Sequence, residues 1–271
     1  MRLRKIGCLL TLAVGLSAAA AAAAENDGFV SLFNGKDLSG WEGDPALWSV
    51  EDGAITGKTT DQAVLPYNKF LIWRGGKPKN FELRALVRQS GNNSGIQYRS
   101  RELPEVGPWS VGGYQMDIHP QPANNAMLYE ERGRGIVAQN GQKVIIEPNG
   151  DKWVVTLGPP VEVKVEDWNE YTIIAQGNHL IHKLNGKVTV DVIDHQASAR
   201  ALEGIIALQL HRGPAMRVQF KDIQLKVLPD GGLISPDQTP IPAGAQKVSA
   251  KKPPAAAGKA VRAKKAGKKK L

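Results

Sequence analysis

The chain has 271 residues, of which 42% are hydrophobic, and this is enough for one large folded domain. Its net charge is +9, but three positive charges precede residue 25 and ten follow residue 245. Residues 25–245 therefore carry a net charge of −4, which argues against nucleic-acid binding through a folded domain.

Residues 1–24 have the pattern of a secretory signal peptide. Three basic residues come first, an alanine-rich apolar run follows from Ile6, and small residues precede Glu25. An N-terminal membrane anchor is the alternative, but the strongly apolar part is shorter than the ~20 residues of a membrane span. The only cysteine, Cys8, lies in this segment. We therefore expect an exported protein without disulfides, in a bacterial periplasm or outside the cell.

Short strands separated by turn residues are predicted between Gly28 and Leu228. The candidates, in chain order, are residues 48–51, 54–56, 70–73, 81–87, 95–99, 114–119, 126–129, 143–146, 153–155, 161–165, 169–175, 179–184, 187–192, 204–210 and 216–227. The Asn185-Gly186 pair predicts a tight hairpin between two of them. No helical period and no strand–helix–strand spacing follow the signal. The pattern favours an all-β antiparallel sandwich or jelly roll, as one domain over residues 25–228.

Residues 229–271 are predicted to be a linker followed by a disordered tail. Residues 229–244 contain four prolines, and lysine, alanine and proline dominate from residue 251 onward. A segment of this composition cannot build a core. We expect its positive charge to attract anionic polymers of the cell envelope.

Three predicted strands carry an unusual set of polar side chains on one face. They are Ile96–Arg99, Tyr114–His119 and Leu208–His211. Alternation places aliphatic residues or tyrosine on one face of each strand. The opposite faces carry Gln97 and Arg99, then Gln115, Asp117 and His119, then Gln209 and His211. Ordinary solvated faces carry Lys, Glu, Thr and Ser, whereas these side chains suit a polyhydroxylated ligand and proton transfer.

Asp117 and His211 are the leading candidates for a catalytic base and acid. The alternative is an Asp held in a salt bridge and an exposed His. Arg99 is the third catalytic candidate, because its rigid fork of donors can hold a keto oxygen, a carboxylate or neighbouring hydroxyls. It could instead form an ion pair with Asp117 or with a Glu.

Further residues are expected to bind the substrate. Gln97, Gln115 and Gln209 can donate and accept hydrogen bonds, Asn93 leads into a polar strand, and Trp109 lies in a loop where it can stack on a sugar. Alternation allows only one of Glu130 and Glu131 to face the sheet that carries Asp117. Glu130 is predicted to bind the substrate. Either glutamate could instead pair with Arg132 or Arg134. His179 and His182 fall on opposite faces of a strand, so we expect no metal between them, and no cofactor.

A family resemblance rests on residues 29–41 (FVSLFNGKDLSGW), which resemble the opening of the 3-keto-disaccharide hydrolase family. Later segments agree in order: 93–99 (NSGIQYR), 113–115 (GYQ), 167–170 (DWNE), 184–186 (LNG) and 208–211 (LQLH). The resemblance implies a concanavalin A-like sandwich of two curved sheets with a ligand site on the concave face. It also implies export, and action on glycosides already oxidised to a ketone at C3. Many members have Glu where this chain has Gln115, so Asp117 on the same face is expected to take over.

The expected reaction begins with removal of the C2 proton, which the C3 ketone makes acidic. Asp117 or His211 is the base, Arg99 stabilises the enolate, the group at C1 leaves, and water adds back. A sugar 3-dehydrogenase would supply the substrate. A non-catalytic carbohydrate-binding module is the main alternative, followed by an ordinary glycosidase using Glu130 or Glu131, and then a structural envelope protein.

Overall fold

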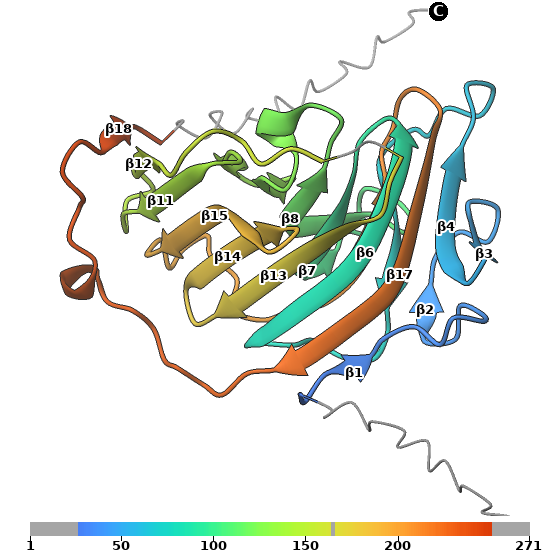
Figure 1. Cartoon of the computed structure of the whole chain (residues 1–271), viewed down its shortest axis with the longest axis horizontal. Helices are drawn as coiled ribbons and strands as arrows, with labels where there is room; N and C mark the ends of the chain where they lie inside the picture. The colour runs from blue at the N-terminus through green and yellow to red at the C-terminus, as the bar shows by residue number, and fades with distance from the viewer. Residues whose placement is uncertain (1–26, 164–165, 251–271) are drawn as a thin grey trace, which may run out of the picture.

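The computed structural model describes residues 27–163 and 166–250, which form two β-sheets and two short 3₁₀ helices (Figure 1). The predicted signal peptide at residues 1–24 and the lysine-rich part of the predicted tail, from residue 251, lie outside these residues. In the described part of the chain, no helix is long and apolar enough to cross a membrane.

The strands are short and follow one another closely along the chain. They are β1 (Val30–Ser31), β2 (Trp41–Glu42), β3 (Trp48–Glu51), β4 (Ala54–Thr59), β5 (Lys69–Trp73), β6 (Phe81–Gly91), β7 (Ser94–Glu102), β8 (Val111–Ile118), β9 (Leu128–Glu131), β10 (Gly135–Ala138), β11 (Gln142–Ile146), β12 (Lys152–Thr156), β13 (Asn169–Gln176), β14 (His179–Leu184), β15 (Lys187–Asp194), β16 (Ile205–Leu210), β17 (Met216–Val227) and β18 (Gln246–Val248). The 3₁₀ helices are η1 (Pro122–Asn124) and η2 (Pro236–Gln238).

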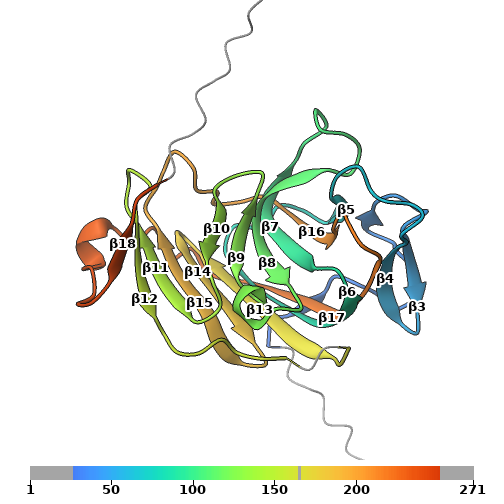
Figure 2. The same ribbon diagram turned by 90° about the horizontal axis from the view of Figure 1, so that it is seen from above.

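The strands form one sheet of eleven and one of seven. The larger sheet has the order β18-β12-β11-β15-β14-β13-β6-β17-β4-β3, with β1 paired to β17, and the smaller has the order β10-β9-β8-β7-β16-β5-β2. Seen from above, the larger sheet curves around the smaller one (Figure 2). β11 and β15 run parallel, whereas the central neighbours β6, β13, β14 and β17 are antiparallel. The all-β sandwich predicted from the sequence is confirmed.

An apolar core fills the space between the two sheets. In β6 every second residue from Phe81 to Gln89 is buried, because side chains alternate across a strand. From the smaller sheet, Tyr98 and Tyr114 stack with their ring centroids 5.6 Å apart, and Phe81 meets Tyr98 edge-on at 6.2 Å. These aromatic contacts join the two layers across the core.

The predicted hairpin joins β14 and β15. Asn185 and Gly186 form its turn with φ values of 49° and 77°, and Leu184 pairs with Lys187. Positive φ at both central residues is what a type I′ turn requires, and Asn followed by Gly adopts it at little cost.

Residues 229–250 differ from the expected linker, because they run back along the larger sheet. Ile234 exchanges two hydrogen bonds with the Asn178 side chain, at 2.8 and 3.0 Å, and Thr239 Oγ1 lies 2.7 Å from His195 Nε2. β18 then pairs with β12 at the edge of that sheet. Pro236 opens η2 within this segment, and polar groups of Ile234 and Thr239 find partners on the domain. We call residues 229–250 the C-terminal strap.

The second face of the smaller sheet points away from the core and positions the site. Leu71, Ile96 and Met116 face the core, so their neighbours along each strand face the other way. On that face Gln97 pairs with both Gln115 and Ala207 across the strands. This outer face of the smaller sheet therefore collects the polar side chains of β7, β8 and β16.

Candidate active site

A pocket of about 340 Å³ opens on the outer face of the smaller sheet. Its most deeply buried polar residues are Gln115, Asp117 and Gln209, none more than 3% exposed. The other lining residues are Asn68, Asn93, His119, Met127, Tyr129, Glu131, Ile136 and His211. The structure thus brings Asp117 and His211 together with three of the residues predicted to bind the substrate. We call this pocket the Asp117 pocket.

A chain of buried amide groups holds Gln115 against Asp117. Gln97 Nε2 and Gln209 Nε2 donate to Gln115 Oε1 at 2.7 and 2.9 Å, and Gln115 Nε2 donates to Asp117 Oδ1. The Ser100 hydroxyl donates to Gln97 Oε1 at 2.6 Å. Because each amide is oriented by its neighbour, Gln115 presents an N–H group to the carboxyl group of Asp117.

Gly95 makes room for the Gln115 side chain. Gly95 pairs with Asp117 across the two strands, directly beside this amide chain. A Cβ atom at position 95 would lie 2.5 Å from Gln115 Cδ and 2.7 Å from Gln115 Nε2, closer than non-bonded atoms approach. Any larger residue there would displace Gln115 from its hydrogen bonds.

The burial of Asp117 makes its carboxyl group suitable for proton transfer. Burial raises the pKa of Asp117 from 3.8 to about 7, the hydrogen bond from Gln115 opposes this rise, and the charge of Glu131 adds to it. A group whose pKa lies close to neutral pH can both take up and return a proton there.

Two histidines line the pocket with opposite tautomers. His211 Nδ1 lies 2.5 Å from the carbonyl oxygen of Arg212 and 3.3 Å from Asn92 Nδ2. The carbonyl only accepts and is much the closer partner, so Nδ1 carries the proton and Nε2 is an acceptor. His119 Nδ1 accepts the backbone N–H of Gln121 at 3.0 Å, so its Nε2 carries the proton. Burial lowers the pKa of both rings from the ordinary 6.5, which favours the neutral forms at pH 7. The pocket therefore holds one imidazole that accepts and one that donates.

Gln209 and Tyr129 add further polar groups to the pocket lining. Gln209 Oε1 is buried and has no hydrogen-bond partner among the described residues. Burial raises the pKa of Tyr129, which keeps its phenol neutral and able both to donate and to accept. An unpaired buried acceptor beside groups of this kind suits the hydroxyl groups of a sugar.

Glu131 supplies the second carboxyl group of the pocket. Asn68 Nδ2 lies 3.3 Å from each of its oxygens. Burial raises the pKa of Glu131, although the charge of Arg132 and the bond from Asn68 oppose this. Across residues 27–163 and 166–250, no group of three or more His, Cys, Asp or Glu side chains is placed to hold a metal ion.

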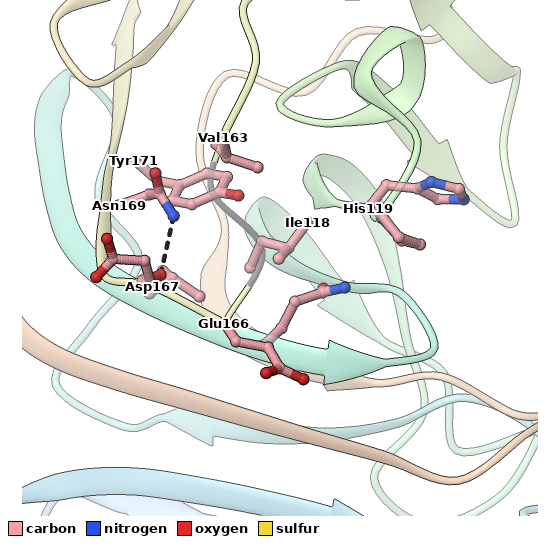
Figure 3. Close-up of a pocket in the computed structure, with 10 residues that line it drawn as sticks. Ile118, His119, Val163, Glu166, Asp167, Asn169 and Tyr171 are labelled. Atoms are coloured by element: carbon pink, nitrogen blue, oxygen red, sulfur yellow. Dashed lines mark hydrogen bonds between the residues drawn. The ribbon is translucent and has the colours of Figure 1, made fainter.

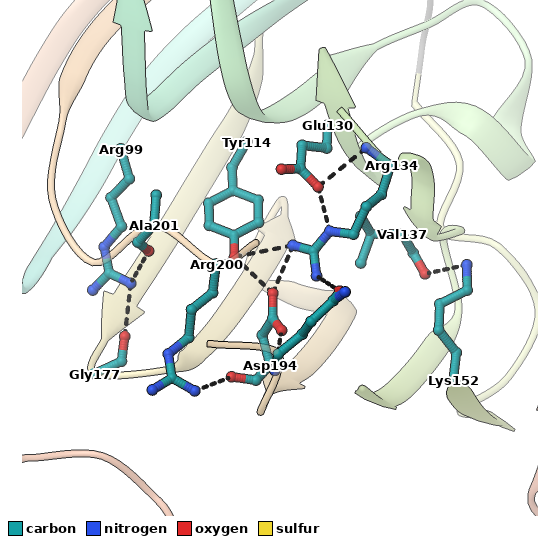
Figure 4. A network of polar contacts seen from close by, with 11 residues as sticks. Arg99, Tyr114, Glu130, Arg134, Val137, Lys152, Gly177, Asp194, Arg200 and Ala201 are labelled. Carbon is teal, nitrogen blue, oxygen red and sulfur yellow. Dashed lines mark hydrogen bonds and ion pairs between the residues drawn. The ribbon is translucent and has the colours of Figure 1, made fainter. Parts of the chain in front are cut away.

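The prediction that Glu130 binds the substrate is wrong. Tyr114 pairs with Glu130 across the strands, so Glu130 points to the same side of the sheet as that buried tyrosine. There Glu130 forms an ion pair with Arg134, which also binds Asp194 at 2.6 Å (Figure 4). One of the two glutamates is thus a structural partner of an arginine, as the sequence suggested.

Arg99 does not join the pocket either, which corrects its predicted catalytic role. It is 2% exposed, and its guanidinium donates to the carbonyl oxygen of Lys79 at 2.9 Å. It also donates to the carbonyl oxygen of Gly177 at 2.7 Å (Figure 4). The cause is a bulge in β7: the pairing with β8 shifts between Tyr98 and Arg101, and Arg99 has a φ of 46°. A bulge breaks the alternation of faces, so Arg99 no longer points where Gln97 does.

Two predicted substrate contacts lie next to the pocket rather than in it. Gln97 is fully buried behind Gln115 and orients it, but does not line the pocket. Trp109 packs on an apolar cluster that includes Phe70 and Val111, and it is absent from the pocket lining. Gln97 and Trp109 were predicted to contact the ligand directly, and the structure gives them a supporting role instead.

Several residues that line the pocket were not among the predicted catalytic or substrate-binding residues. His119 could have been found, because the alternation that selects Asp117 places it on the same face. The position of Glu131 in the pocket depends on the register of the β8–β9 pair, in which Glu131 lies opposite Gly113. The sequence does not show that register. Asn68 precedes β5 in a segment without periodicity, so the sequence offers no signal for it.

A second, much smaller hollow lies on the other side of His119. Figure 3 shows Tyr171, Asn169 and Asp167 on one side of it and His119 on the other. Its volume is about 10 Å³, enough for one water molecule at most. It is therefore too small to bind a substrate.

Comparison with known proteins agrees with the resemblance seen in the sequence. The family described as 3-keto-alpha-glucoside-1,2-lyase-like domain matches residues 28–226. A 3-keto-disaccharide hydrolase of Bacteroides thetaiotaomicron is 38% identical over 85 residues, which are 28% of this chain and 29% of that protein. A structure from Parabacteroides distasonis, solved as a candidate glycosyl hydrolase, shares the fold with a TM-score of 0.50 at 19% identity, over 74% of this chain and 94% of that one. The predicted family is thus confirmed, and the chain belongs to the 3-keto-alpha-glucoside-1,2-lyase-like domain family.

Proposed function

We propose that the Asp117 pocket cleaves the glycosidic bond of 3-keto-glycosides by removing the C2 proton and eliminating the group at C1. The observation that supports this most directly is a buried carboxyl group with a pKa of about 7 beside two neutral histidines. Family membership and the unpaired Gln209 acceptor agree with a sugar as the ligand.

The first step forms an enolate. Ionised Asp117 takes the proton from C2, which the neighbouring ketone acidifies, and the electron pair of the C2–H bond moves into a C2=C3 enolate. The enolate oxygen needs a donor, and His119 Nε2–H takes the place that the sequence had given to Arg99.

The second step breaks the glycosidic bond and the third adds water. The enolate electrons form a C1=C2 double bond as the C1–O pair leaves with the aglycone, which Glu131 protonates. His211 Nε2 then removes a proton from a water that adds to C1, and Asp117 returns a proton to C2. The proton held by His211 passes through solvent to Glu131, which restores all three groups. The net change is hydrolysis, without an oxidant or a reductant. An enzyme that oxidises the C3 hydroxyl must supply the substrate, and the export expected from residues 1–24 would place the reaction outside the cytoplasm.

Hydrolysis of a 3-keto-glucoside in heavy water tests this reaction. The C2 position of the released 3-keto-glucose should carry deuterium, with product incubated without protein as the control for spontaneous exchange. The rate should rise with pH through about 7, because the base must be ionised. Hydrolysis with no deuterium at C2 would exclude the enolate.

A second candidate is ordinary glycoside hydrolysis by a pair of carboxyl groups. Asp117 and Glu131 line the same pocket, and the charge of Glu131 raises the pKa of Asp117. Such a pair can act as acid and nucleophile or base on an unoxidised glycoside. Turnover of nitrophenyl glucosides would favour it. Sugar binding with no turnover of either substrate class would leave a carbohydrate-binding module.

A further inference from the structure

A larger hollow, of about 400 Å³, adjoins the Asp117 pocket. Asn68, Glu131 and His211 line both, so the two hollows meet along these side chains. Tyr67 and Arg132 lie on the far side of that boundary, together with Arg212. We call this larger hollow the arginine hollow.

The two arginines of this hollow lack close carboxylate partners. Arg132 reaches Glu131 at 4.0 Å, and the guanidinium of Arg212 has no ion pair or hydrogen bond within the described residues. By contrast Arg84 and Arg217 form ion pairs at 2.6 and 3.1 Å. Glu131 is the one acid that lines the hollow, so a single carboxyl group faces two guanidinium groups. The hollow is therefore electropositive.

The rest of the hollow is held in place by specific contacts. The backbone N–H of Arg212 donates to Asn68 Oδ1 at 2.8 Å, which ties the Arg212 loop to the boundary between the hollows. The Tyr67 hydroxyl donates to the carbonyl oxygen of Pro108 at 3.3 Å. Gly107 allows that approach, since a Cβ there would lie 2.2 Å from the Tyr67 hydroxyl oxygen. Tyr67 thus offers a fixed ring beside the two positive charges.

We propose that the arginine hollow binds the aglycone and selects aglycones that carry a carboxylate. This rests on the proposed function, because a sugar whose C2 lies over Asp117 sends its C1 substituent across the boundary formed by Glu131 and His211. A planar or sugar ring can then lie against Tyr67, and its carboxylate meets Arg132 and Arg212. Arginine forks bind carboxylates in a bidentate manner, which gives both attraction and direction.

The test compares matched substrates that differ only in charge. The 4-carboxyphenyl 3-keto-glucoside is set against its 4-carbamoylphenyl counterpart, and a 3-keto-glucosyl glucuronate against the corresponding glucose disaccharide. We expect kcat/KM to be roughly tenfold higher for the charged member, and the preference to fall as salt is added. The two pairs show whether an aromatic acid or a uronic acid is the better source of the carboxylate.

The variants Arg132→Ala and Arg212→Ala should each reduce the preference, and the double variant should remove it. Arg101→Ala is the matched control, because Arg101 is an exposed arginine of the same sheet that lines neither hollow. Equal kcat/KM for charged and neutral substrates in the wild type would overturn the aglycone assignment and leave the proposed function standing. Cleavage of none of the four substrates would overturn the proposed function, and the assignment with it.

Discussion

Replacing Asp117 by Asn should stabilise the fold at neutral and alkaline pH while it abolishes turnover. The pKa of this carboxyl group is about 7 in the folded chain, because burial disfavours its charge, against an ordinary value of 3.8. The folded state thus holds the proton more tightly than the unfolded state. The stability that the protonated carboxyl group contributes is complete below its ordinary pKa of 3.8, and it is lost as the pH rises through the folded-state pKa of about 7.

The size of this effect follows from the difference between the two pKa values. Each unit corresponds to about 1.4 kcal/mol, so a difference of about three units makes the wild type roughly 4 kcal/mol less stable at about pH 8 than at low pH, as far as this group is concerned. Asn cannot ionise and escapes that loss. The advantage of D117N over the wild type should therefore grow by several kcal/mol between about pH 4 and about pH 8.

Urea denaturation followed by tryptophan fluorescence measures this difference at a series of pH values. Asp191→Asn is the matched control. Burial would raise the pKa of Asp191, but hydrogen bonds from His179 and Lys143, at 2.7 and 3.0 Å, hold it below its ordinary value. D191N should therefore destabilise the protein at pH 7. A difference between D117N and the wild type that stays constant with pH would show that Asp117 titrates as an exposed group, and its role as base would fail.

Three further predictions follow from contacts of the site and the core. Gly95→Ala should lower the free energy of unfolding by about 2–4 kcal/mol, because it leaves buried amides unpaired. The control is Gly231→Ala, at an exposed glycine beside another glutamine, which should cost less than about 0.5 kcal/mol. Equal denaturation midpoints for the two variants would contradict the buried amide chain. Arg134→Ala removes the ion pair of the Asp194 carboxylate, which is 1% exposed, and should lower the free energy of unfolding by about 3 kcal/mol. Arg132→Ala, whose contact with Glu131 is long, should lower it by less than about 0.5 kcal/mol. Thermal or urea unfolding distinguishes these values. His211→Ala should lower kcat/KM on a 3-keto-glucoside by about 100-fold or more, with unchanged unfolding, and a loss below about threefold would remove this ring from the mechanism.

Alternation along strands carried most of the information that the sequence held about the site. It placed Gln115, Asp117 and Gln209 correctly, because β8 and β16 are regular where these residues lie, and it placed His211, which directly follows β16, in the same pocket. The same rule failed for Arg99, where a bulge and a positive φ reverse the direction of the side chain. A bulge is fixed by contacts with other strands, and alternation within one strand does not reveal it.

Tertiary neighbours decided what alternation left open. A Cβ at Gly204 would lie 2.4 Å from the carbonyl carbon of Arg99, so the β7 bulge depends on a glycine about a hundred residues away in the chain. Glu130 and Glu131 were separated only by the register of β9 against β8. The tautomers of His119 and His211 depend on backbone groups of the following residues, which a side-chain pattern does not show.

The C-terminal strap has a practical consequence for anyone who expresses a shortened form of this protein. A recombinant chain that stops at residue 228 would lack β18, so β12 would become an unpaired edge strand. The side-chain amide of Asn178 would also lose its hydrogen bonds to Ile234. Exposed strand borders recruit other molecules and promote aggregation. Truncations should therefore retain everything through residue 250, even though every residue that lines the Asp117 pocket lies before residue 212.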